Sequence, residues 1–173
     1  MVLKFKKNKL KNSIEGAMGF FSLINIAHLD EMTNATFLQF VDKKYSYQGQ
    51  KHEEPCCIMY FEGMKIIYTD ESKEILGFTG KKAIISFPDS SRDSFPIYYT
   101  TEISLKNPNI MNPYKEIPGV LLEFRANLGN SEIQMVAEKY SPEYLPDKEF
   151  HYPRNYREIS KHEMEKIINA LLE

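Results

Sequence analysis

The sequence predicts an α+β fold, in which a curved antiparallel sheet of five to seven strands carries an N-terminal and a C-terminal helix packed on it. Two observations lead to this class. Apolar residues recur at helical spacing near both ends of the chain, and between about residues 35 and 128 they alternate with polar residues as in half-buried strands. A chain of 173 residues fits one domain, so we expect residues 1–173 to form a single domain.

The first helix is predicted over residues 13–29. Ser13 is a typical N-cap residue, and the apolar residues after it follow helical spacing. Gly16 and Gly19 each weaken a helix by about 1 kcal/mol relative to alanine, so these glycines could instead mark close packing against a neighbouring element. The apolar positions of the predicted helix are Ile14, Ala17, Met18, Phe21 and Ile24.

Strand patterns occupy the middle of the chain. Residues 57–69 are interpreted as a hairpin that turns at Glu62-Gly63, because glycine supplies the positive φ that a tight turn needs. The clearest alternation runs over residues 120–128, with one dry and one wetter face, which is typical of antiparallel pairing. The other predicted strands cover residues 36–41, 82–87 and 97–105.

The last third of the chain contains one ambiguous segment and one clear helix. Residues 131–140 fit either a helix, with Ser131 and Gln134 as a capping box, or a strand that returns from a hairpin turn. At the C-terminus, Ser160 and Glu163 form a second capping box. The apolar positions of this C-terminal helix are Met164, Ile167, Ile168, Leu171 and Leu172.

The net charge of −2 conceals an asymmetry. Residues 1–11 contain five lysines and no acid, and could form a flexible basic segment, whereas residues 12–173 have 17 basic against 24 acidic side chains. An acidic body disfavours nucleic acid, because cations that neutralise phosphates supply most of that binding energy. We therefore expect another protein, and a basic one, as the partner, with no nucleic acid or membrane partner.

The stretch KHEEPCCIMYFEG, residues 51–63, looks at first like a metal or thiol site. Adjacent side chains of a strand point to opposite faces, so Cys56 and Cys57 should not share one metal ion. The acids Glu53 and Glu54 oppose formation of a thiolate. We therefore expect two buried structural cysteines, and no catalytic residue, cofactor or metal site.

The compartment is predicted from the cysteines and the N-terminus. A basic start followed by the apolar run of residues 16–27 has the outline of a signal peptide, but Ser22 and Asn25 interrupt that run. The run is also too short and too polar to span a bilayer. Because two adjacent cysteines do not form a disulfide framework, we expect a cytoplasmic protein.

The segment of residues 139–160, called the strap below, combines five aromatic residues, several charges and three prolines without clear periodicity. One interpretation is a structural strap pinned to the sheet by its rings; the other is a binding surface that presents tyrosines and acids to a partner. The predicted partner-binding residues are Tyr140, Glu143, Tyr144, Asp147, Glu149, Tyr152 and Tyr156.

These observations favour a non-catalytic protein-binding module. Within that class the best hypothesis is a bacterial immunity protein, which neutralises a toxin by covering its basic active site with an acidic, tyrosine-rich face. The alternative is a small enzyme or ligand-binding protein with a pocket between sheet and helices and a Cys/His pair as its chemistry.

Overall fold

The computed structural model describes the chain apart from positions 54, 60, 89–91, 107, 110–111 and 173. The chain divides into two compact units. Met1–Ile58 and Glu143–Glu173 make the first, called the terminal unit below, and Met59–Pro142 make the second, the central unit. The sequence-based expectation of one domain stays a prediction.

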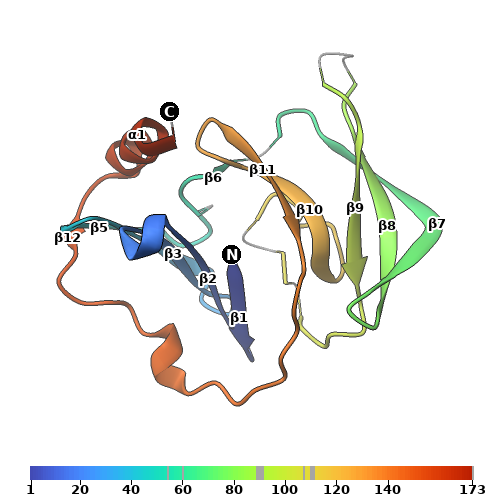
Figure 1. Ribbon diagram of the computed structural model, residues 1–173, viewed down its shortest axis with the longest axis horizontal. Helices are drawn as coiled ribbons and strands as arrows, with labels where there is room; N and C mark the ends of the chain where they lie inside the picture. Colours follow the sequence, from blue (N-terminus) through green and yellow to red (C-terminus); the bar gives the residue numbers. More distant parts are fainter. Residues whose placement is uncertain (54, 60, 89–91, 107, 110–111, 173) are drawn as a thin grey trace. The chain divides into compact units, whose positions relative to one another are not determined.

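The terminal unit is built on a sheet with the strand order β1-β2-β3-β4-β5-β12 (Figure 1). The first five strands form an antiparallel meander, and β12 lies parallel to β5, where the Ile159 amide donates to the Ser46 carbonyl at 2.9 Å. The strands are β1 (Val2–Lys6), β2 (Lys9–Gly16), β3 (Phe21–His28), β4 (Thr33–Phe40), β5 (Lys43–Gln48) and β12 (Arg157–Glu158).

The predicted helix over residues 13–29 is wrong. This segment forms the end of β2, a single 3-10 turn η1 (Ala17–Gly19) and β3. Gly19 has φ +89°, which no helix accommodates, and β-branched residues such as Ile24 and Ile26 favour a strand. The helical spacing arose because two alternating strands, which pair Ile14 with Leu23, are joined by a short turn.

The C-terminal helix is confirmed as α1 (Lys161–Leu172). Its capping box forms as expected: the Ser160 amide donates to the Glu163 carboxylate at 3.0 Å, and the Glu163 amide donates to the Ser160 hydroxyl at 3.3 Å. Met164 and Ile168 are buried, and the helix contacts β5. The helix therefore covers its apolar stripe within the terminal unit.

The central unit contains a second antiparallel sheet with the order β11-β10-β9-β8-β7, and the short β6 pairs with β10. The long β7–β8 pair is drawn in green in Figure 1. The strands are β6 (Ile58–Met59), β7 (Lys65–Ile75), β8 (Phe78–Ser86), β9 (Phe95–Thr100), β10 (Val120–Leu128) and β11 (Ser131–Val136).

Three details of the strand prediction change. The turn at Glu62-Gly63 is confirmed, with Gly63 at φ +70°, but the hairpin is wrong because β6 pairs with β10 and β7 pairs with β8. The strand expected over residues 97–105 ends at Thr100. The ambiguous segment 131–140 begins with strand β11, which returns from β10 through Gly129 at φ +55°.

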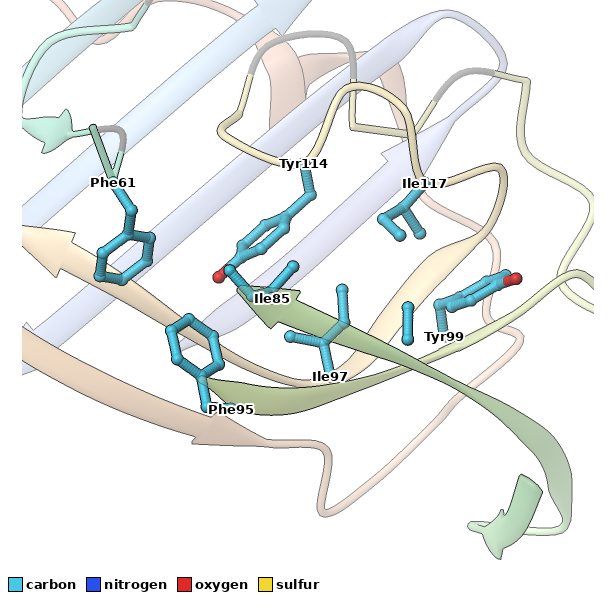
Figure 2. Close-up of a cluster of buried hydrophobic side chains, with 8 residues drawn as sticks. Phe61, Ile85, Phe95, Ile97, Tyr99, Tyr114 and Ile117 are labelled. Atoms are coloured by element: carbon cyan, nitrogen blue, oxygen red, sulfur yellow. The ribbon is translucent and has the colours of Figure 1, made fainter. Parts of the chain in front are cut away.

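Aromatic and branched side chains fill the core of the central unit (Figure 2). Tyr114 is fully buried there, and its hydroxyl donates to the Arg125 carbonyl. Asn109 holds the loop that carries Tyr114, because its amide donates to the carbonyls of Ile117 at 3.0 Å and Gly119 at 2.7 Å. The core residues labelled in Figure 2 are Phe61, Ile85, Phe95, Ile97, Tyr99, Tyr114 and Ile117.

The predicted α+β class, with a single sheet of five to seven strands and helices at both ends, is therefore wrong; the chain has two sheets, in both of which the expected antiparallel pairing predominates. The described residues form twelve strands, one α-helix and two short 3-10 helices. The fold is mostly β because the N-terminal apolar pattern belongs to strands. In the described part of the chain, no helix is long and apolar enough to span a membrane.

Candidate functional site

Two of the predicted partner-binding tyrosines belong to a packed cluster of the terminal unit. The rings of Tyr152 and Tyr156 each lie 5.4 Å from the ring of Phe37 on β4. Burial raises the pKa of both tyrosine hydroxyls. These two residues pin the strap to the sheet, as the structural interpretation of the strap expects.

The strap's acids face lysines of the same chain. Glu149 lies 2.8 Å from Lys4, and Asp147 lies 3.2 Å from Lys6. Hydrogen bonds from these lysines lower the pKa of both carboxyls. The basic N-terminal segment is accordingly not separate from the acidic body: it forms β1 and the start of β2, and is paired with the short 3-10 helix η2 (Asp147–Phe150).

The remaining three predicted residues are solvent-exposed. Tyr144 exposes 84% of its surface, with Lys6 Nζ 4.7 Å from its ring centre, and Glu143 beside it is also exposed. Tyr140 belongs to the central unit and packs edge-on against Phe78 at 5.1 Å. The structure thus groups Tyr144, Asp147 and Glu149, while the partner-binding role of all seven residues stays a prediction.

An apolar surface that the sequence analysis missed lies at one end of the first sheet. We call it the tip, and define it as Met18, Phe20, Phe40 and Val41, which expose 97%, 55%, 38% and 49% of their surfaces. The Val41 amide donates to the Phe20 carbonyl at 2.7 Å, so the β2–β3 and β4–β5 turns adjoin.

The backbone of the tip is strained. Met18 has φ +53° and Val41 has φ +55°. A β-branched residue in this left-handed region is a genuine outlier, and such strain persists where the surrounding structure enforces it. In the sequence, Gly16 and Gly19 on either side of Ala17-Met18 indicated a turn with an apolar residue in it. The helical interpretation of residues 13–29 led us to overlook that turn.

The expected opposite-facing cysteines are also a wrong prediction. Cys56 and Cys57 are bonded to each other, with their Cα atoms 3.8 Å apart, and both are buried. They lie in a bend before β6, where Cys57 takes φ +77°, so the alternation of strand side chains does not apply. With both sulfurs in a disulfide, neither is a nucleophile in this state. Glu54, which was expected to oppose a thiolate, lies outside the described residues.

The segment before the cysteines is held by a polar network of the terminal unit. The amide of Asn34 donates to the Glu53 carbonyl at 2.7 Å, and Lys161 lies 3.5 Å from the Glu53 carboxylate. A hydrogen bond with the Tyr47 hydroxyl lowers the pKa of Glu53, while burial raises that of Tyr47. Among the described residues, no group of three or more His, Cys, Asp or Glu is arranged for a metal ion.

A groove of about 590 Å³ opens on the central unit, between the turn after β6 and the loop before β10. Phe61, Met64, Ile66 and Pro113 supply its apolar surface. Its charged lining residues are Glu62, Lys65, Lys115 and Glu116. No cysteine or histidine of the described chain lines the groove, so these residues do not provide the Cys/His chemistry of the alternative hypothesis.

Comparisons with known proteins give a fold and no family. No protein-family model and no curated protein matches the chain. A solved structure, "Structure of PNGF-II in P21 space group", aligns over 94% of this chain with a TM-score of 0.54 and 15% sequence identity. The chain spans only 28% of that protein's length. At this identity the likeness concerns the fold alone: this chain is similar in fold to part of PNGF-II.

Proposed function

We propose that this protein is a non-catalytic protein-binding module and that the tip is its principal binding surface. The observation that carries the proposal is the exposure of four large apolar side chains on two adjoining turns. Exposed apolar groups at one place mark interaction sites more often than scattered ones do. Methionine and phenylalanine are also enriched in the buried centres of protein interfaces.

The strained backbone supports the same proposal. Asparagine or glycine at positions 18 and 41 would relieve the left-handed conformation and remove apolar surface at the same time. Met18 and Val41 at these positions lower the stability of the free protein relative to asparagine or glycine, and they also expose apolar side chains to water. Burying such side chains against a partner contributes about 1.5–3 kcal/mol each.

Within this class we keep the role of a bacterial immunity protein that neutralises a toxin domain. Residues 12–173 carry 24 acidic against 17 basic side chains, and the five lysines of residues 1–11, some of which pair with strap acids, reduce this excess to a net charge of −2. The support is this remaining acidic excess, which favours encounter with a basic partner. Asp147 and Glu149 are already paired with lysines of this chain, so a basic partner that binds them must compete with those lysines. The tip provides an anchor that needs no such competition.

The test uses co-expression with the protein encoded by the adjacent gene, followed by binding measurements on the purified pair. Met18→Asn with Val41→Asn should weaken binding by at least about tenfold, because two apolar contacts are lost. If the partner is a toxin, the same variant should lose the ability to restore growth. An adjacent gene for an unrelated metabolic enzyme, with no binding, would contradict the immunity role.

Leu76→Asn is the matched control. Leu76 is also an exposed apolar residue in a turn, with φ +55°, but it lies in the central unit. This variant should bind the partner as the wild-type chain does. Equal binding by the tip variant and the wild type would contradict the assignment of the tip, even if the protein is a binding module.

The groove of the central unit favours one alternative, a small-ligand-binding protein. Its apolar surface and mixed charges suit a ligand with both signs of charge. A Met64→Ala variant should then reduce ligand-induced thermal stabilisation, which Met18→Asn would leave unchanged. Stabilisation that is unaffected by Met64→Ala would exclude the groove.

A cytoplasmic location remains part of the proposal, and the Cys56–Cys57 bond tests it. Protein disulfides are rare in the cytosol and persist in oxidising compartments. Acid-quenched cells should therefore yield the reduced form if the protein is cytoplasmic. Recovery of the bonded form would contradict that location.

A further inference from the structure

The β1–β2 hairpin presents four lysines on one face. Lys4 lies directly opposite Lys11, and Lys6 lies directly opposite Lys9. Residues two apart on a strand point to the same side, so all four ammonium groups share one surface, called the lysine face below. Like charges directly opposite each other destabilise a hairpin unless anions lie between them.

The strap supplies one carboxylate to each opposed pair. Glu149 lies 2.8 Å from Lys4 and 3.9 Å from Lys11. Asp147 lies 3.2 Å from Lys6 and 3.8 Å from Lys9. The two acids are separated by one residue, and the two lysine pairs by one step of two residues, about 6.8 Å along the strands. The lysine face is therefore complementary to two acidic residues separated by one residue.

The lysine face remains positive with the strap in place. Four ammonium groups face two carboxylates, and Lys7, in the hairpin turn, is close enough to lower the pKa of Asp147. Lys148, which stands between Asp147 and Glu149 in the sequence, adds another positive charge. The strap is therefore an incomplete counterion for this surface.

The contact is also exchangeable. Residues 141–144 of the strap are exposed, and solvent-exposed ion pairs are weak because water and salt screen the charges. One direct hydrogen bond, from Lys6 Nζ to the Leu145 carbonyl at 2.7 Å, uses backbone that any peptide offers. Phe150 is buried next to the acids and keeps the strap close, so the strap competes from a high effective concentration.

We propose that the lysine face is a binding surface for an acidic segment of another protein, with two carboxylates separated by one residue, and that the strap occupies this surface as an intramolecular competitor. The partner should offer the same groups as the strap, which are two carboxylates separated by one residue. Binding requires displacement of Asp147 and Glu149, so the strap sets the threshold affinity that a partner must exceed.

The experiment titrates a synthetic peptide of residues 143–150 into the full chain and follows the backbone amide signals of β1 and β2 by NMR. The peptide should bind Asp147→Asn/Glu149→Gln at least about tenfold more tightly than the wild type, because the competing strap has lost both charges. Lys4→Gln/Lys11→Gln introduced into that variant should remove the binding. Equal affinity for the wild type and the strap variant would overturn the proposal.

Two controls separate a specific site from general charge attraction. Glu143→Gln removes an exposed strap acid that lies outside the lysine contacts, and this variant should behave as the wild type does. A peptide of the same composition with its aspartate and glutamate adjacent should bind more weakly. Equal binding of that peptide, or equal binding of an unrelated polyanion, would overturn the specificity for two acidic residues separated by one residue.

Folding and self-association are checked in the same samples. The strap variant keeps Phe150, Tyr152 and Tyr156, so it should retain the dispersed spectrum of the wild type; Glu149→Gln alone serves as a milder second variant. If the wild type forms a dimer by exchanging straps, the lysine face binds a second copy of this chain. That result would overturn the proposal that the partner is a different protein. The tip variant Met18→Asn should leave peptide binding unchanged, so this test is independent of the proposed function.

Discussion

The two units differ in how often a non-glycine residue takes the left-handed conformation in a turn. Every hairpin turn of the terminal meander includes a non-glycine residue with positive φ, namely Lys7, Met18, Met32 and Val41. The central unit has glycine with positive φ in its turns, at Gly63, Gly77 and Gly129, and Leu76 beside Gly77 is its non-glycine example. The terminal unit also has its strap held by ion pairs, whereas the central unit has a continuous aromatic core. Left-handed non-glycine residues are therefore concentrated in the terminal unit, where we place both binding surfaces.

The largest expected effect comes from the core of the central unit. Tyr114→Ala should lower the free energy of unfolding by about 3–5 kcal/mol, because it removes a fully buried ring and leaves the Arg125 carbonyl without its donor. Urea denaturation measures the loss. Tyr144→Ala, at an exposed strap tyrosine, is the control and should change stability by less than about 0.5 kcal/mol. Similar losses in both variants would remove the contrast between the units.

A pair of turn substitutions should have opposite signs. Val41→Asn should raise the free energy of unfolding by about 1 kcal/mol, because asparagine tolerates the left-handed conformation that valine resists. Gly77→Val should lower it by about 1–2 kcal/mol, because a Cβ at Gly77 meets no neighbour and only the backbone resists. Thermal and urea unfolding of both variants provide the values. A stabilising Gly77→Val would show that the turns do not differ in strain.

The Cys56–Cys57 bond should contribute little to stability. A disulfide between adjacent residues closes the smallest possible loop, so it restricts the unfolded chain by about 1 kcal/mol or less. Reduction should add two hydrogens to the mass and shift the melting temperature only slightly. Cys56→Ala/Cys57→Ala should keep partner binding, and a folded double variant that lost it would make these cysteines functional candidates again.

The smallest effect concerns pH and the lysine face. The pKa values of Asp147 and Glu149 are lowered in the folded chain, so their contribution to stability is complete above the ordinary carboxyl range near pH 4 and is lost as pH falls through the lowered values. Melting temperatures of the wild type and Asp147→Asn/Glu149→Gln should therefore differ at neutral pH and converge in acid. Parallel curves at all pH values would show that these ion pairs do not stabilise the terminal unit.

The sequence correctly predicted the helix and the strand that are determined by interactions between residues close together in the chain. The capping box of Ser160 and Glu163 located α1, and strict alternation located β10. The N-terminal segment failed because two strands joined by a short turn imitate helical spacing, and nothing in Met18 or Val41 as residue types announces a left-handed backbone. Propensity is a weak guide where tertiary context decides the conformation.

The candidate sites depended on contacts between distant parts of the chain. Both the lysines of residues 1–11 and the acids of the strap were visible in the sequence, but Lys4 and Glu149 are 145 positions apart. A single sequence gives no register for such a pair, so the acids were assigned to an external partner. The strap tyrosines were ambiguous for the same reason, because only the fold shows which rings meet Phe37.

The parallel pairing of β12 with β5 also has a consequence for how the chain is made. The central unit lies between these two strands in the sequence, so a ribosome completes all of it before Arg157 emerges. During that interval β5 is an open edge, with backbone groups that another nascent chain could join. The terminal unit is complete only after β12 has been made, because Arg157 and Glu158 pair with Tyr45 and Ser46 of β5. During synthesis the five-stranded meander therefore lacks its final strand until the whole central unit has been made.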